Sequence, residues 1–412
     1  MGGTDQARCT RRSPAATNVG NSKENNGGVT RNLPVDAVIN LDHGDPTMYE
    51  SYWRTLGDDE CTFVIKGYES LSYFSNPKNP CWFLEPKLEE SIKSLHGAVG
   101  NAATDGYSIV VGTGSSQLLQ AVLYAVTSHD QPNQINVVSA APYYSSYPEI
   151  TDLVRSGLYK WAGDAHQFDK NEPYVEFVTS PNNPSGVIRG PVVNGGGGIL
   201  VHDLAYYWPQ YTPITSSLEF DIMLFTASKC TGHAGSRIGW ALVKDKEVAK
   251  KMTKFMEVIT IGVSKESQLR VAKILQVIVD RCKCFGSPEG HNFFEFGKNL
   301  LTKRWEILRE TVKQNKMFIL PKYPLQHCNY TGDVTQAHPA FAWIKCKDGT
   351  DCEKLFRNHN ILTRGGRKFG SDPGFVRVSM LGREEEFNLF IDRLSMIQIF
   401  NKGDGHENEN LD

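Results

Sequence analysis

Short apolar runs alternate with longer amphipathic segments from about residue 107 onwards. The runs are rich in β-branched and aromatic residues, as buried strands are: SIVV, INVVS, YVEFVTS, GILVHD, DIMLFT and IGWALVK. Between and after them, apolar side chains recur three and four positions apart, which predicts helices over residues 115–126, 145–156, 246–258 and 266–279. Strands that alternate with helices in this way predict a mainly parallel, helix-covered sheet and an α/β fold.

The pattern changes near residue 300. A long polar helix is expected near 291–316, followed by the separated strands PAFAWIKC and GFVRVSM and by helices at 351–359 and 384–398. This arrangement of separated strands and helices is typical of a smaller α+β domain.

We therefore predict a large domain at residues 71–300 and a small C-terminal domain at 301–400. Residues 35–70 are expected to contribute to the small domain. The chain ends, residues 1–34 and 401–412, are expected to be disordered tails, because the first in particular has almost no large apolar side chains to bury.

Composition narrows the possible functions. The 412 residues include 44 basic and 46 acidic side chains, mixed along the chain with a net charge of -2, so neither nucleic acid nor a membrane is an expected partner. No apolar run approaches the ~20 residues that a membrane span needs, and no secretory apolar segment is evident. The nine cysteines are scattered without a C-x-x-C pair, so we expect no disulfide framework, no metal site and a cytoplasmic protein.

Ligands of such sheets bind beyond the carboxyl ends of the strands, which directs attention to the polar residues that follow each strand. After SIVV, the segment Gly112–Ser116 opens a helix, and the backbone amides with Ser115 and Ser116 can hold a phosphate. A glycine-rich turn with a serine helix cap is the alternative. The segment lacks the third glycine of a dinucleotide fingerprint and the Gly-Lys-Ser/Thr of a P-loop.

The next two strands are also followed by polar groups. Asn183 lies in SPNNPSG after YVEFVTS, where it offers an amide donor or simply belongs to a turn. Asp203 ends the strand GILVHD and Tyr206 follows three residues later. Asp203 is either part of a ligand site or a helix cap.

Lys229 follows the strand DIMLFT, with Thr226 and Ser228 before it and Arg237 eight residues beyond. A lone lysine in a loop is usually solvated surface. Together, however, the four sets fit one ligand that has a phosphate, a ring nitrogen for Asp203, a phenolic oxygen for Asn183 and Tyr206, and an aldehyde for Lys229. Pyridoxal phosphate has all of these groups.

These residues resemble the class I aminotransferases of pyridoxal phosphate fold type I, whose lysine motif is nearly matched by TASK with an arginine eight positions after the lysine. The chain is more similar still to the plant tryptophan aminotransferase family of auxin biosynthesis, within the alliinase C-terminal fold. The similar motifs run from about Val38 to Phe400: LDHGDPT, SYFSNP, CWFLEP, VVGTGS, SPNNPSG, HDLAYYWP, SKCTGHAGSRIGWALVKD and VRVSML. Thr226, His233 and the glycine run at 195–198 depart from the family pattern.

The resemblance implies a homodimer with shared active sites and a role for each matching position. Lys229 is the implied catalytic residue, bonded covalently to the cofactor aldehyde and acting as acid and base. The implied cofactor-binding residues are Tyr73 from the second subunit, Ser115, Ser116, Tyr144, Asn183, Asp203, Tyr206, Thr226, Ser228, Lys229 and Arg237. The implied substrate contacts are Arg377, for the α-carboxylate, and Gly44.

The activity that the resemblance implies is transamination of L-tryptophan with a 2-oxo acid, pyruvate, giving indole-3-pyruvate for auxin biosynthesis. An alliinase-like lyase that cleaves cysteine sulfoxides would use the same lysine and cofactor, although the chain shows neither a signal peptide nor a cysteine-rich N-terminal module. A cofactor-holding protein without catalysis is the third hypothesis, and the intact Lys229, Asp203 and Arg377 argue against it. No residue pattern distinguishes an indole from a phenyl side chain.

Overall fold

The computed structural model describes most of the chain between Pro34 and Ile397. The described residues are 34, 36–57, 60, 62–128, 130–131, 133–168, 171–193, 197–282 and 292–397. The tails predicted at 1–34 and 401–412 lie outside them, apart from Pro34, as do Gly195 and Gly196 of the glycine run.

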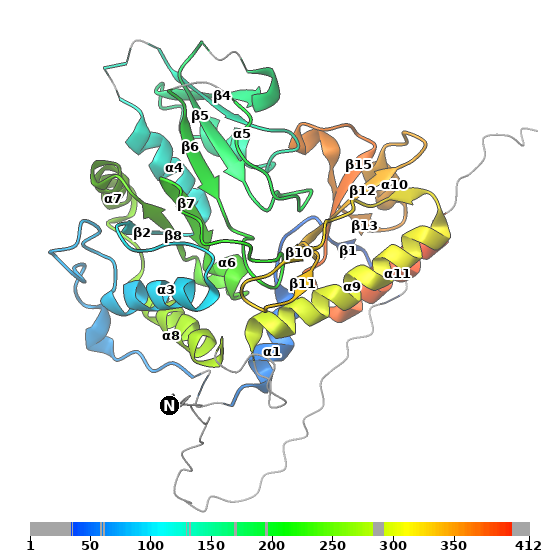
Figure 1. The fold of residues 1–412 in the computed structure, drawn as a ribbon, viewed down its shortest axis with the longest axis horizontal. Coiled ribbons are helices and arrows are strands. Elements are labelled where there is room, and N and C mark those ends of the chain that lie inside the picture. Colours follow the sequence, from blue (N-terminus) through cyan, green and yellow to red (C-terminus); the bar gives the residue numbers. More distant parts are fainter. Residues whose placement is uncertain are drawn as a thin grey trace, which may run out of the picture. The chain divides into compact units, whose positions relative to one another are not determined.

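The larger of the sheets has seven strands in the order β2-β8-β7-β6-β5-β3-β4 (Figure 1). Its strands are β2 (Ser108–Gly112), β3 (Ile135–Ser139), β4 (Tyr159–Asp164), β5 (Tyr174–Thr179), β6 (Ile199–Asp203), β7 (Ile222–Thr226) and β8 (Gly239–Val243). The pairs from β7 to β4 are parallel, and β8 runs antiparallel to both of its neighbours. The prediction of a mainly parallel sheet is therefore confirmed, while the edge strand β4 was not predicted.

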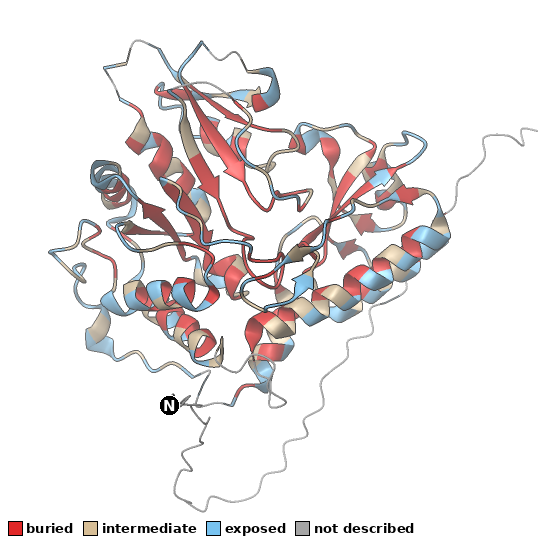
Figure 2. Ribbon diagram, in the orientation of Figure 1, coloured by how far each residue is buried: buried red, intermediate tan, exposed pale blue. Residues whose placement is uncertain are grey.

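Helices that carry an apolar face cover this sheet. The helices of this part are α3 (Pro86–Val99), α4 (Ser115–Val126), α5 (Tyr147–Asp152), α6 (Ala227–Cys230), α7 (Lys246–Thr260) and α8 (Lys265–Cys282). Helix α3 packs on α8, and α4 packs on α7 and on the strands β2, β7 and β8. The strands are mostly buried between these layers (Figure 2). Helix α5 is shorter than the predicted 145–156, and Arg155 just beyond it has a left-handed φ of 48° that ends helical geometry.

The C-terminal part contains a second, antiparallel sheet in the order β14-β15-β12-β9. Its strands are β9 (Phe318–Ile319), β12 (Phe341–Cys346), β14 (Arg364–Gly365) and β15 (Phe375–Ser379). A separate two-stranded ribbon joins β10 (Gln326–His327) to β11 (Val334–Thr335). The accompanying helices are α9 (Phe293–Asn315), α10 (Cys352–Asn358) and α11 (Glu384–Met396), close to the predicted ranges. The division of the chain into domains near residue 300 stays a prediction.

The N-terminal segment joins this C-terminal part. Strand β1 (Ile39–Asn40) pairs in parallel with β13 (Ile361–Leu362), and the amide of Ser379 donates to the carbonyl of Leu41. Helix α1 (Glu50–Thr55) follows. The short 3-10 helices of the described chain are η1 (Thr47–Tyr49), η2 (Gly67–Ser70), η3 (Ala165–Gln167), η4 (Ala234–Ser236) and η5 (Gly366–Phe369).

One disulfide joins Cys346 at the end of β12 to Cys352 at the start of α10. This bridge was not predicted, because two cysteines separated by five residues give no sequence signal of their pairing. Among the described cysteines, Cys81, Cys230 and Cys328 are buried free thiols. None of the described helices has the length and apolar character required to cross a membrane.

Candidate active site

The carboxyl ends of β5, β6 and β7 open into a cavity of about 330 Å³. All of the predicted site residues except Tyr73 line it: Gly44, Ser115, Ser116, Tyr144, Asn183, Asp203, Tyr206, Thr226, Ser228, Lys229, Arg237 and Arg377. Parallel strands end at the same edge of a sheet, which is why segments far apart in sequence meet here. Their individual roles stay predictions at this point.

Lys229 enters the cavity from α6, the single helical turn that follows β7. Its amine donates to the carbonyl oxygen of Gly44, and its own carbonyl oxygen accepts from the Tyr211 hydroxyl at 3.0 Å and from Gln210 at 3.2 Å. Burial lowers the Lys229 pKa to about 8, and the charges of Arg377 and Arg237 act in the same direction. The backbone is thus anchored while the amine is held in a less basic state than that of a surface lysine.

Gly44 is placed where a side chain would crowd the lysine. A Cβ atom there would lie 2.9 Å from Cζ of Phe341 and 3.0 Å from the Lys229 amine. Only a residue without a side chain leaves both groups in place.

Asp203 ends β6 with its carboxylate buried in the cavity. Tyr147 donates its hydroxyl to Oδ2 at 2.9 Å, and the amide of Ala205 donates to Oδ1 at 3.2 Å. Burial raises the Asp203 pKa, and these two hydrogen bonds oppose that effect. Within the described chain no basic side chain forms an ion pair with it.

The alternative role of Asp203 as a helix cap is wrong, because a turn rather than a helix follows it. The glycine run at 195–198 lies shortly before β6, and Asp203 at the end of that strand lines the cavity.

The start of α4 faces Arg237. Gly114 precedes the helix with a φ of 76°, and a Cβ atom on it would lie 2.4 Å from a terminal nitrogen of Arg237. The other terminal nitrogen of Arg237 donates to the carbonyl of Ala234 at 3.0 Å and lies 3.5 Å from the Ser228 hydroxyl. A helix start, hydroxyl groups and a guanidinium therefore surround one end of the cavity.

Two details of this end differ from the sequence-based expectations. The helix cap of α4 is Gly114, not a serine, so Ser115 and Ser116 form the first turn itself. The Thr226 hydroxyl accepts from the Ser228 amide at 3.2 Å and donates to the Ile238 carbonyl at 3.2 Å, so it stabilises the turn that carries Lys229.

Arg377 reaches the cavity from β15 and is 2% exposed. One terminal nitrogen donates to Oδ1 of Asn183 at 2.9 Å and the other to the carbonyl of Asp42, while Nε has no partner among the described residues. The guanidinium lies 4.1 Å from the ring centre of Phe341. Burial lowers the Arg377 pKa to about 10, a value at which the group remains charged at neutral pH.

Asn183 uses its oxygen for this bond, which leaves its amide nitrogen as the donor for a ligand. Tyr206 lies across the same cavity, with its ring centre 5.8 Å from the Lys229 amine and 5.6 Å from the ring centre of Phe341. Tyr144 packs edge-to-face on Tyr147 with 5.3 Å between ring centres.

Tyr73 is the predicted residue that the cavity does not include. Its side chain is 68% exposed, on a segment that also exposes Val64, Leu71 and Phe74. Tyr73 does not line the cavity of the single chain, and its role in a second subunit stays a prediction.

The sequence did not reveal several residues that shape the site. The Thr179 hydroxyl oxygen lies 2.5 Å from the Tyr147 hydroxyl oxygen. Because Tyr147 donates its proton to Asp203, the Thr179 hydroxyl donates to Tyr147 and completes the chain of hydrogen bonds. Phe341 and Arg364 also line the cavity. Tyr147 had one signal, its position in the polar segment after the strand INVVS, whereas Thr179, Phe341 and Arg364 lie inside ordinary strands.

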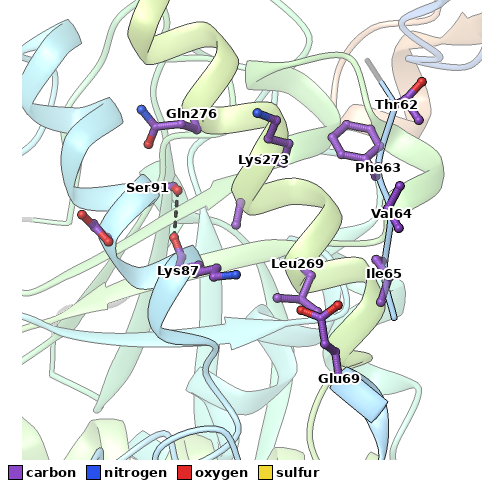
Figure 3. Close-up of a pocket in the computed structure, with 12 residues that line it drawn as sticks. Thr62, Phe63, Val64, Ile65, Glu69, Lys87, Ser91, Leu269, Lys273 and Gln276 are labelled. Carbon is purple, nitrogen blue, oxygen red and sulfur yellow. Dashed lines mark hydrogen bonds between the residues drawn. The ribbon is translucent and has the colours of Figure 1, made fainter. Parts of the chain in front are cut away.

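A second cavity, of about 360 Å³, lies between residues 62–65 and the helices α3 and α8 (Figure 3). Its lining combines Phe63 and Val64 with the charged side chains of Lys87 and Lys273. None of the predicted site residues lines it, so the chemistry that the sequence predicts belongs to the cavity at the sheet edge.

Comparison with known proteins shows the family and the fold of the chain. A protein-family model described as allinase matches residues 39–398. The chain is 55% identical over 362 residues to tryptophan aminotransferase-related protein 2 of Arabidopsis thaliana, with 87% of this chain and 81% of that protein covered. It is 37% identical over 356 residues to an alliin lyase of Allium cepa, with 84% and 73% covered.

Solved structures share the fold at low identity. An aspartate aminotransferase double mutant from Thermus thermophilus matches with a TM-score of 0.59 and 18% identity, over 87% of this chain and 91% of that chain. YbdL from Escherichia coli, for which a methionine aminotransferase function is described, matches with a TM-score of 0.61 and 15% identity, over 87% and 93%. At such identities the likeness concerns the fold alone.

Proposed function

The chain belongs to the alliinase family and has the pyridoxal phosphate-dependent aminotransferase fold of type I, and on this basis we propose that it transfers the amino group of L-tryptophan to a 2-oxo acid. The acceptor is pyruvate and the product is indole-3-pyruvate, which belongs to auxin biosynthesis. The similarity to tryptophan aminotransferase-related proteins, 55% and 53% identical in Arabidopsis thaliana and Oryza sativa subsp. japonica, supports this choice. The cytoplasmic location stays a prediction.

The observation that carries the proposal is the meeting of Lys229, Asp203 and Arg377 in one cavity. An amine of lowered pKa, a buried carboxylate and a buried guanidinium are the groups that amino-acid chemistry with this cofactor requires.

The cofactor of the family is pyridoxal 5′-phosphate, and the residues present fit it. Asp203 is a buried carboxylate without a cationic partner in the described chain, which suits a protonated ring nitrogen. Gly114 lets the Arg237 guanidinium lie against the start of α4, and a guanidinium beside a helix start suits a phosphate. When bound, the cofactor supplies an electron sink for the negative charge left at the substrate α carbon.

We assign the remaining contacts from their positions around the cavity. The amide of Asn183 and the hydroxyl of Tyr206 are the donors to the phenolic oxygen of the ring, and Tyr144 packs on the ring face. The phosphate contacts are Ser115, Ser116, Thr226, Ser228 and Arg237.

Lys229 is the proposed attachment point and the group that moves the proton. With a pKa of about 8, a useful fraction of its amine is neutral in mildly alkaline solution, so Nζ can take the proton from the substrate α carbon and return it. The bond from Nζ to the Gly44 carbonyl orients the amine within the cavity.

Arg377 is the proposed anchor for the substrate carboxylate. Its bonds to Asn183 and to the Asp42 carbonyl fix the plane of the guanidinium, while Nε and the second hydrogen of each terminal nitrogen remain for a ligand. A carboxylate can then be held by two parallel hydrogen bonds.

We further propose a homodimer in which Tyr73 completes the phosphate site of the partner subunit. The large exposed apolar side chains around Tyr73, from Val64 to Phe74, support a surface that another chain covers.

The second candidate is a lyase that eliminates a sulfenic acid from a cysteine sulfoxide, supported by the 37% identity to alliin lyases. It would use the same cofactor and the same Lys229. The two activities differ in whether an oxo acid is consumed.

A screen of amino donors and 2-oxo acids on the purified protein, with identification of the products, tests the proposal. We expect indole-3-pyruvate and alanine from L-tryptophan and pyruvate, and no product without the oxo acid. Pyruvate and ammonia formed from a cysteine sulfoxide alone would favour the lyase. Borohydride reduction should fix the cofactor to Lys229, and a label on another lysine would contradict the assignment.

A further inference from the structure

Two arginines face the substrate cavity from neighbouring strands. Arg364 in β14 lies directly opposite Arg377 in β15, and residues opposite each other in paired strands project to the same face of the sheet. Both side chains line the cavity. If Arg377 holds the α-carboxylate, Arg364 is a second fixed positive charge beside the substrate.

Arg364 is already paired. Its Nε lies 2.5 Å from Oδ1 of Asp42 and one terminal nitrogen lies 3.1 Å from Oδ2, so that two parallel hydrogen bonds join the side chains. The remaining terminal nitrogen donates to the Ser145 hydroxyl at 2.9 Å. The two ionic side chains are only 20% and 23% exposed, which limits screening by water.

Asp42 remains ionised in this setting. Burial raises its pKa, but the hydrogen bond and charge of Arg364 outweigh that effect and leave the pKa below its ordinary value. Unlike Arg364, Asp42 is not among the residues that line the cavity. A carboxylate of the chain itself, which is not part of the cavity lining, therefore neutralises the charge of Arg364.

We propose that Asp42 is a specificity-determining residue: by occupying Arg364 it selects substrates with one carboxylate over substrates with a second carboxylate on the side chain. The inference rests on the proposed function and specifies the substrate class of the same site. A second carboxylate would find Nε and one terminal nitrogen of Arg364 already bonded to Asp42, and it would have to lie beside that negative charge or displace it.

A purely structural role for Asp42 has a different consequence. Its carbonyl oxygen accepts from Arg377, so a disturbed Asp42 would weaken the binding of every carboxylic acid alike. The ratio of the affinities for monocarboxylic and dicarboxylic acids therefore distinguishes the two roles of Asp42, whereas overall activity does not.

The test compares butyrate with succinate, which share four carbons and differ in the second carboxylate. Their dissociation constants are measured by calorimetry on the cofactor-loaded protein, without turnover. We expect the wild type to bind butyrate more tightly than succinate. In Asp42→Asn, the affinity for succinate relative to that for butyrate should rise by roughly tenfold or more, as for a charge-assisted hydrogen bond. The double variant Asp42→Asn/Arg364→Gln should lose this gain. Ser145→Ala, which removes only the third bond of Arg364, should leave the preference unchanged.

Equal weakening of both ligands in Asp42→Asn, or an unchanged preference, would overturn the proposal. Should that variant fail to fold, Arg364→Gln replaces it. This variant leaves the Asp42 carboxylate unpaired, and its negative charge must then weaken the binding of succinate more than the binding of butyrate. As a second readout, the ratio of kcat/KM for 2-oxoglutarate to that for pyruvate should rise in Asp42→Asn. Binding without turnover also separates the two proposals, because a lyase would still show the preference for butyrate over succinate.

Discussion

The amine of Lys229 lies among charges of both signs. Arg377 and Arg237 add to the effect of burial in lowering the Lys229 pKa to about 8, whereas Asp45 acts in the opposite direction. Below this pKa the amine carries a proton and is unreactive, and above it the amine is a nucleophile and a base. The residues around Lys229 therefore decide at which pH the site becomes competent.

Two substitutions should move this pKa in opposite directions. Arg237→Gln removes a positive neighbour and should raise the Lys229 pKa, and Asp45→Asn removes a negative one and should lower it. The readout is the pH dependence of Lys229 acylation in cofactor-free protein, followed by mass spectrometry of the Lys229 peptide. Asp221→Asn, at an exposed ion pair with Lys244, serves as the control. Shifts of the same sign in both variants would contradict this account.

Asp203 and Tyr147 should differ in importance for proton removal. Asp203→Asn should keep the cofactor but slow exchange of the α hydrogen by about 100-fold or more, because an amide cannot hold the ring nitrogen as a cation. Tyr147→Phe removes one hydrogen bond to that carboxylate and should slow exchange by roughly tenfold. The exchange of α deuterium measures this step alone. An unchanged rate in Asp203→Asn would leave Asp203 with only its structural bonds to the Tyr147 hydroxyl and the Ala205 amide.

At the scale of secondary structure, the start of α4 depends on one glycine. Gly114→Ala places a methyl group in the left-handed region, at a cost of about 1 kcal/mol in stability, and drives it into Arg237. The variant should bind pyridoxal phosphate at least about tenfold more weakly while binding unphosphorylated pyridoxal as before. Equilibrium titration monitored by cofactor absorbance measures both.

Gly100→Ala is the matched control for this experiment. Gly100 ends α3 with a φ of 71°, but a Cβ atom there meets nothing within 4 Å. Gly100→Ala should lower the free energy of unfolding by a similar amount and leave the affinities for pyridoxal phosphate and pyridoxal unchanged. If the two variants behaved alike, the effect would be backbone strain and not loss of the phosphate contact.

The sequence predicted positions correctly where a single strand or helix shows a clear pattern of apolar and polar residues. Asp203 ends a strand of five residues and Lys229 lies three residues beyond the end of another, so their place at the sheet edge could be predicted from the pattern alone. Their roles came from the resemblance to a family and stay proposals. The two-residue strands β1, β13 and β14 were missed because so few positions show no periodicity. The pair of Asp42 with Arg364 joins residues separated by 322 positions, and nothing local marks it.

At the scale of the whole molecule, four of the described histidines are kept neutral. Burial is the main cause that lowers the pKa of His96, His202, His233 and His338 to about 4. Unfolding returns each pKa to about 6.5, so the unfolded chain binds more protons between pH 6.5 and pH 4. Their contribution to stability is fully present above pH 6.5 and is lost as the pH falls through that range.

The free energy of unfolding should consequently fall steeply below pH 6.5, and one substitution should reduce the slope. His202→Phe can keep the stack on Phe220, whose ring centre lies 3.6 Å away, and removes one titrating group. The slope should decrease by up to about 1.4 kcal/mol per pH unit around pH 5. Denaturant titrations at a series of pH values give the slope directly, and equal slopes for both proteins would refute the assignment.

The shared site of the proposed homodimer predicts complementation between two inactive chains. Lys229→Ala lacks the amine and Tyr73→Ala lacks the proposed partner contribution, yet a mixed dimer would contain one site with both residues native. Co-expressed and purified through two different tags, the mixed dimer should exceed the mean activity of its parents severalfold. No gain over that mean would show that Tyr73 does not act across the dimer.

The pairing of β1 with β13 also constrains when the protein can become functional during its synthesis. Ile39 leaves the ribosome early, but its strand partner Ile361 and the substrate arginine Arg377 are among the last described residues to be made. A nascent chain can form the parallel sheet around Lys229 long before the segment that carries Gly44 has its strand partner. The proposed cofactor contacts around Lys229 are therefore synthesised well before the proposed carboxylate anchor, and the complete site arises only after nearly the whole chain has been translated.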